Sequence, residues 1–77
     1  MNNLNRAIEQ FRAASCAPRA VKNRILIAAY EIEHSGDVDA MARAIGVMSD
    51  HANLPCVAPL LAAAAGALEA AMYGAAA

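Results

Sequence analysis

The chain has 77 residues, a formal net charge of −1, and a composition that is 60% hydrophobic but only 4% aromatic. A chain of this length forms one domain at most, and so small a domain buries only about 60% of the surface that its unfolded form exposes. Alanine accounts for 22 residues and tryptophan for none. Because a buried Ala contributes a single methyl group, about 0.8 kcal/mol, we expect a thin core and a monomer that gains stability from self-association or a bound protein.

Apolar residues at helical spacing predict four helices, at about 3–15, 18–34, 37–52 and 57–74, in a single domain over residues 1–77. The first helix has one apolar face, made by Leu4, Ala7, Ile8, Phe11 and Ala14. In the second, Pro18 suits the first turn and Gly36 suits a left-handed C-terminal cap. This second helix has two apolar faces, the first made by Val21, Ile25, Ala28, Ala29 and Ile32 and the other by Leu26, Ile27 and Tyr30.

Asp37 is the predicted N-cap of the third helix, because its carboxylate can accept exposed N–H groups of the first turn. The expected core stripe of that helix is Val38, Met41, Ala42, Ile45, Met48 and Ala52. Pro55 and Pro59 are the alternative starting points of the fourth helix, on either side of its approximate start at residue 57, since both prolines cannot lie inside one regular helix. Its expected stripe is Val57, Leu61, Ala64, Ala65, Leu68 and Met72. No segment alternates with a period of two, so we predict an all-α fold: a small bundle of three to four antiparallel helices with an Ala-rich C-terminal helix.

Charge is distributed unevenly along the chain. Residues 1–24 contain five basic residues and one acidic residue, whereas residues 25–77 contain one basic residue and six acidic ones. Antiparallel helices place the first and third connections at one end, so the basic residues gather there and many of the acidic residues near the other end. These charged ends are either simply solvated or one of them meets a partner of opposite sign.

Four residues are of the types that bind zinc: Cys16, His34, His51 and Cys56. Their spacing lacks the paired steps of a structural zinc site, so we expect no metal and no other cofactor. Cys16 with His51 lacks an orienting third group and an oxyanion motif, so we predict no enzyme. Cys16 and Cys56 can approach each other at one end of the bundle. On this basis a disulfide between them is an alternative. We expect two free thiols, because two cysteines are too few for a disulfide scaffold.

Two resemblances imply binding functions. Ala42, Gly46 and Val47 resemble the turn of a helix-turn-helix, which implies a small DNA-binding regulator with a recognition helix beginning within residues 49–54. The motif is degenerate, because Asp50 would face the DNA phosphates and Pro55 would truncate the helix. The end of the second helix and residues 35–48 resemble one tetratricopeptide-type hairpin, which implies a protein-binding scaffold, with Met41 where that family has a small Ala.

We predict a non-enzymatic interaction module that binds another protein, as a small inhibitor, adaptor or assembly chaperone does. Its expected binding surface combines the spare apolar face of the second helix with a basic rim, made by Leu26, Ile27, Tyr30, Arg19, Lys22 and Arg24. Self-association as a homo-oligomer is the other expected contact. It would use a ridge of small residues on the fourth helix, where a second backbone can approach closely: Ala62, Gly66, Ala70 and Gly74.

A membrane-associated protein is a further alternative, because residues 57–77 have about the length of a membrane-spanning helix. Glu69 interrupts that stretch and no Lys or Arg follows it, which favours a helix packed in a bundle. We therefore expect neither a membrane nor a nucleic acid as partner, and no small-molecule substrate. The N-terminal residues 1–4 lack the basic and apolar regions of a signal peptide, so we expect the cytoplasm as the location.

Overall fold

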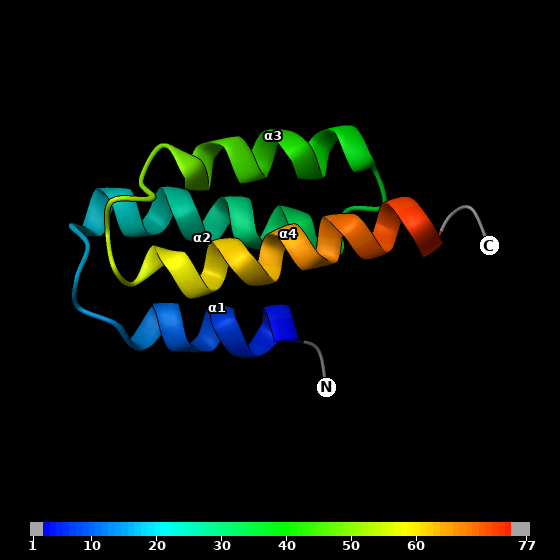
Figure 1. The fold of residues 1–77 in the computed structure, drawn as a ribbon. Coiled ribbons are helices and arrows are strands. Elements are labelled where there is room, and N and C mark those ends of the chain that lie inside the picture. The colour runs from blue at the N-terminus through cyan, green and yellow to red at the C-terminus, as the bar shows by residue number, and fades with distance from the viewer. Residues whose placement is uncertain (1–2, 75–77) are drawn as a thin grey trace.

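The computed structural model describes residues 3–74, which form four helices. These are α1 (Asn3–Ala13), α2 (Arg19–His34), α3 (Val38–Ser49) and α4 (Val57–Gly74). They run alternately up and down, so residues 14–18 and 50–56 form loops at one end and residues 35–37 connect α2 to α3 at the other (Figure 1). The predicted all-α bundle is therefore confirmed, and the largest difference in helix bounds is at the end of α3, which stops at Ser49 rather than at residue 52.

The centre of the bundle lies between α2 and α4, which pack against each other and each contact both remaining helices. Within residues 3–74, α1 and α3 make no contact with each other, so they flank this central pair on opposite sides. The C-terminal end of α4 projects beyond the ends of its neighbours (Figure 1). As a result, the first half of α4 supplies its buried residues, Val57, Leu60 and Ala64.

Each helix contributes two or three large side chains to the core, and alanines fill the space between them. The large buried residues are Leu4, Ile8, Phe11, Ile25, Ile32, Met41, Met48, Val57 and Leu60. Six of the fifteen hydrophobic residues that are buried in the described part of the chain are alanines: Ala7, Ala28, Ala29, Ala40, Ala44 and Ala64. Small side chains let the helix axes approach closely but bury little area each, so the core is thin, as the composition indicates.

The predicted core faces of α1 and α2 are largely confirmed, whereas those of α3 and α4 are rotated. Ala40, Ala44 and Leu60 are buried although none of them was expected in the core. Four residues that were expected there are exposed instead: Ala42, Ala52, Ala65 and Met72. An Ala-rich helix is apolar on several faces, so the sequence pattern does not select one and packing decides.

The ends of α2 and α3 follow local hydrogen bonding. The Asp37 side chain accepts a hydrogen bond from the Asp39 N–H at 3.1 Å, which confirms Asp37 as the N-cap of α3. The left-handed cap expected at Gly36 is wrong, since no described residue has a positive φ. Instead Ser35 ends α2 in an extended conformation, and its hydroxyl accepts from the Asp37 N–H at 3.0 Å. This arrangement leads the chain directly from one helix into the next.

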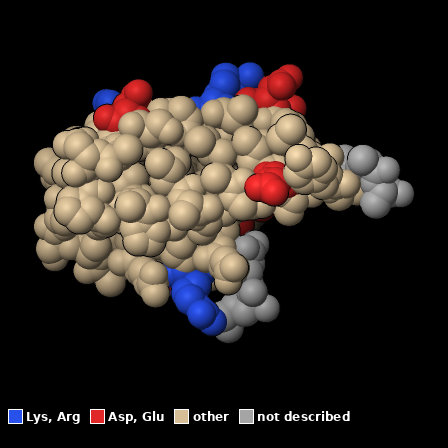
Figure 2. Space-filling view, viewed as in Figure 1, with Lys and Arg blue, Asp and Glu red and all other residues tan. Residues whose placement is uncertain are grey.

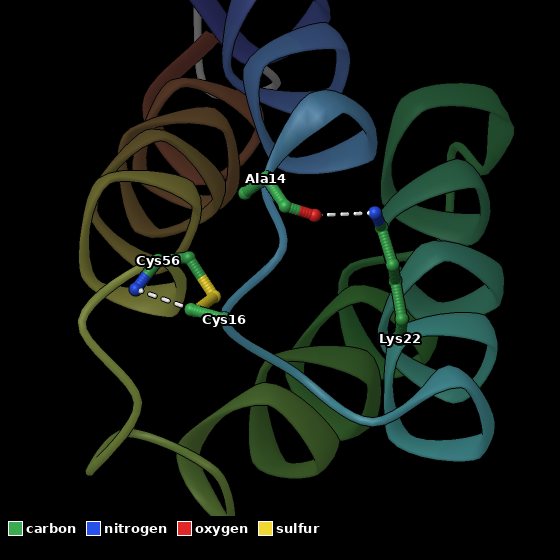
Figure 3. The surroundings of a disulfide bond; sticks show 4 residues. All are labelled: Ala14, Cys16, Lys22 and Cys56. Carbon is green, nitrogen blue, oxygen red and sulfur yellow. Dashed lines mark hydrogen bonds between the residues drawn. A yellow bond between two sulfur atoms is a disulfide. The ribbon is translucent and has the colours of Figure 1, made fainter.

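A disulfide joins Cys16 to Cys56, and their Cα atoms lie 6.1 Å apart (Figure 3). The expectation of two free thiols is therefore wrong. The crosslink connects the loop after α1 to the last residue before α4, across 40 positions of sequence. In the same region, the Lys22 ammonium of α2 donates to the Ala14 carbonyl just beyond α1 (Figure 3). The disulfide and this hydrogen bond, which spans eight positions of sequence, both hold this end of the bundle together.

Leu60 and Leu61 give a direct test of how α4 is rotated. Leu60 is fully buried and Leu61 only half-buried. We expect Leu60→Ala to reduce the free energy of unfolding by about 2–5 kcal/mol, because it leaves a cavity, and Leu61→Ala by less than about 1.5 kcal/mol. Urea denaturation followed by circular dichroism measures both. A larger loss for Leu61→Ala would mean that the sequence pattern, and not this packing, describes α4.

Gly46 offers a stabilising substitution, because it lies inside α3 and a Cβ added there meets no atom within 4 Å. We expect Gly46→Ala to raise the free energy of unfolding by about 0.5–1 kcal/mol through helix propensity. Ala42 is also exposed and lies four residues earlier in α3, so Ala42→Gly is the matched reverse change and should cost a similar amount. Equal signs for the two variants in urea denaturation would contradict this account.

Candidate protein-binding surface

The structure divides the six residues of the predicted partner surface into two groups. Ile27 is 67% exposed, the largest exposed fraction of any bulky apolar residue in α1–α3. Arg19 and Arg24 are exposed as well. Leu26, Lys22 and Tyr30 are half-buried, and both Leu26 and Tyr30 pack against the core. The six residues therefore do not form the single exposed face that the sequence pattern had predicted.

Leu26 is half-buried because it lies on the side of α2 that faces α1. Lys22, one turn before it, donates to the Ala14 carbonyl. Glu33, seven residues after Leu26 and so on the same side of the helix, accepts a hydrogen bond from the Asn5 side chain at 3.0 Å. Contacts with α1 thus bracket Leu26 on both sides along the helix. For the same reason Lys22 is not a free cation of a binding rim.

Ile27 faces a different neighbour, because it borders a shallow groove between α2 and α3. The groove has a volume of about 240 Å³ and is lined by Arg24, Ile27, Ala28, Glu31, Arg43, Ala44 and Val47. Ala28 and Ala44 are buried, whereas Ile27 is exposed and Val47 half-buried. Two guanidinium groups and one carboxylate accompany this apolar surface. The groove can therefore accept an apolar side chain and place a negative charge near Arg24 or Arg43.

Sequence reasoning missed the contribution of α3 to this surface. Val47 was considered for its resemblance to the turn of a helix-turn-helix, and Arg43 was assigned no role. Their four-residue spacing places both on one face of α3, and Arg24, Ile27 and Glu31 have a matching spacing on α2. That signal was available in the sequence. The sequence alone did not indicate that these two faces lie beside each other, because this depends on how α2 packs against α3.

The predicted ridge of small residues lies partly in a second groove, between α4 and the start of α1. This groove has a volume of about 300 Å³ and is lined by Asn3, Leu4, Ala62, Ala63, Gly66, Ala67 and Ala70. Gly74, the fourth residue of the ridge, is exposed but does not line it. Glu69 is the single charged residue of α4, and Figure 2 shows a broad uncharged face with charged side chains mainly along its upper and lower edges.

The residues that were considered as metal ligands or catalytic groups do not come together in one site. Cys16 and Cys56 form the disulfide, and His34 lies at the opposite end of the bundle beside Glu33, with Nε2 3.3 Å from a carboxylate oxygen. Among residues 3–74, no group of three His, Cys, Asp or Glu side chains is placed to hold a metal ion. The turn that a helix-turn-helix requires at Gly46 is also not formed, because α3 continues through it and residues 50–56 are non-helical turns.

Of the described helices, α4 alone is long and apolar enough to cross a membrane by length and composition, with a mean hydropathy of 1.4 over 18 residues. The same helix supplies Val57, Leu60 and Ala64 to the core. To enter a bilayer it would have to leave these contacts and expose the residues of α1 and α3 that it covers. The length and composition of α4 therefore fit a membrane-spanning helix, whereas its buried residues fit a helix that packs in the bundle.

No protein-family model, curated protein or solved structure matches this chain.

Proposed function

We propose that this protein is a non-enzymatic module that binds another protein through the groove between α2 and α3. The single observation that carries the proposal is Ile27, a bulky apolar side chain that is 67% exposed at the edge of a groove lined by two arginines. An apolar residue beside Arg is a common composition for the centre of a protein interface. The thin core supports the same conclusion, because a bound partner adds stability that the monomer lacks.

The groove favours one kind of partner, an amphipathic helix with acidic residues beside its apolar anchors. Helices that bind in grooves insert apolar side chains at intervals of three and four residues. In this groove, one such side chain would pack on Ile27 and Val47 over the floor formed by Ala28 and Ala44. A carboxylate next to it would pair with Arg24 or Arg43. Glu31 would repel an acidic side chain of the partner that lies beside it.

Ile27→Glu tests the surface, with Met72→Glu as the matched control. Both residues are large, apolar and exposed, but Met72 lies near the end of α4, at 52% exposure. We expect Ile27→Glu to weaken binding of the partner about 30-fold or more, as loss of an interface anchor does, without loss of helicity. Met72→Glu should leave the affinity unchanged.

The measurement starts by capturing proteins from the native host with the three forms as baits, and then determines each Kd by calorimetry with the partner identified. Circular dichroism checks that all three forms are folded. If the same proteins bind equally to the original chain and to Ile27→Glu, the groove is not the binding surface.

Self-association is the second proposed interaction, carried by Ala62, Gly66 and Ala70. These residues are exposed on a helix with a single charge, and a Cβ added at Gly66 meets no atom within 4 Å among residues 3–74, apart from its chain neighbours and the backbone of its own helix. The absence of side chains there lets the α4 helix of a second copy approach closely. Tyr73, which is 69% exposed, extends the same helix with apolar area.

Gly66→Leu tests the self-association surface, because it places bulk where a second helix would lie. We expect it to shift the protein to monomer in sedimentation equilibrium experiments that span the micromolar range. Gly46→Leu adds the same side chain to an equally open position on α3 and should leave the association unchanged. A chain that is monomeric at every concentration, or that associates equally in both variants, would rule out the ridge as an interface.

A further inference from the structure

The two sulfur atoms of the disulfide lie in different surroundings. Cys16 is an exposed residue in the loop after α1, whereas Cys56 is half-buried and immediately precedes the first residue of α4. The Cys56 N–H donates to the Cys16 sulfur at 3.3 Å, so the crosslink lies against the start of α4 (Figure 3). Cys16 is therefore the more exposed residue of the pair.

The disulfide also connects two neighbouring helices that the chain leaves far apart. α1 and α4 pack side by side, but α2 and α3 lie between them in sequence. The crosslink joins the end of α1 to the start of α4 and closes a loop across 40 positions. A crosslink of this span removes much of the conformational freedom of the unfolded chain.

We propose that the Cys16–Cys56 disulfide is a redox latch, which a dithiol reductant opens by attack at Cys16. The attacking thiolate forms a bond to Cys16 Sγ, the bond between the two protein sulfurs breaks, and its electron pair leaves on Cys56 Sγ. The second thiol of the reductant then displaces Cys16, so the reductant leaves as a disulfide. Its two electrons and two protons end on Cys16 and Cys56, which become thiols.

The position of Cys56 favours this direction of attack. The leaving thiolate forms at the N-terminus of α4, where the helix dipole stabilises an anion. Attack at Cys56 would take place at a half-buried residue and would release the thiolate in the loop instead. Exposure and charge stabilisation thus select the same sulfur atom, Cys16, for the first step.

Opening the latch has a large effect because the core is thin. Six of the fifteen buried hydrophobic residues are alanines, and the interface between α1 and α4 has no other covalent support than the intervening chain. The reduced chain therefore keeps its helical pattern but loses most of its thermal stability, and the folded bundle depends on the redox state of its surroundings. This inference does not rest on the proposed binding function.

Thermal unfolding of the full chain, followed by circular dichroism with and without dithiothreitol, tests the latch. From a closed loop of this length, we expect reduction to lower the Tm by roughly 15–30 °C, and re-oxidation to restore it. The double variant Cys16→Ser with Cys56→Ser should melt like the reduced chain and show no response to the reductant. A Tm that changes by less than about 5 °C on reduction would overturn the proposal.

The attacked sulfur is identified with reduced glutathione, a reagent with one thiol, in the absence of denaturant. After an acid quench, trypsin separates residues 13–19, which contain Cys16, from residues 44–77, which contain Cys56. We expect mass spectrometry to find the glutathione adduct on the Cys16 peptide. An adduct on the Cys56 peptide would refute attack at Cys16. A disulfide that reacts only at the rate of global unfolding would show that no latch is accessible in the folded protein.

Discussion

The shortage of large apolar side chains in the core is the constraint on which the rest of this structure depends. Fifteen hydrophobic residues among residues 3–74 are buried, and six of them are alanines. Such a core lets four helices pack closely but supplies little hydrophobic free energy for a chain of this size. Bonds between distant segments therefore matter more than they would in a larger domain. The Cys16–Cys56 disulfide and the Lys22 contact to Ala14 both lie at the end of the bundle where α1 must stay beside its partners.

The same constraint shapes the surface. Where α2 meets α3, the buried side chains are Ala28 and Ala44, which fill the contact but leave a hollow above it. Ile27 and Val47 lie along that hollow. Along α4, small residues likewise leave a shallow groove beside α1. The alanines that make the core thin thus also create the two grooves that we propose as contact surfaces.

The proposed partner groove and the proposed disulfide latch lie in different parts of the bundle. The groove beside Ile27 lies between α2 and α3, whose connection at residues 35–37 is at the end opposite the disulfide. The latch instead holds α1 to α4. Because α2 and α4 pack against each other in the centre, loss of α4 from the bundle would also remove the support behind the groove. Redox state and partner binding would then be coupled through the folding equilibrium, without a direct contact between the two sites.

The sequence by itself determined what depends on neighbouring residues: four helices, their approximate bounds, the Asp37 cap and an antiparallel order imposed by short connections. It also placed Cys16 and Cys56 at the same end of the bundle. Only tertiary packing decided the rest. It brought their Cα atoms to 6.1 Å, buried Leu60 in preference to Leu61, and turned Leu26 toward α1 while leaving Ile27 exposed. The physical reason is that an Ala-rich or doubly apolar helix presents several faces of similar hydrophobicity, and only contact with its neighbours selects one.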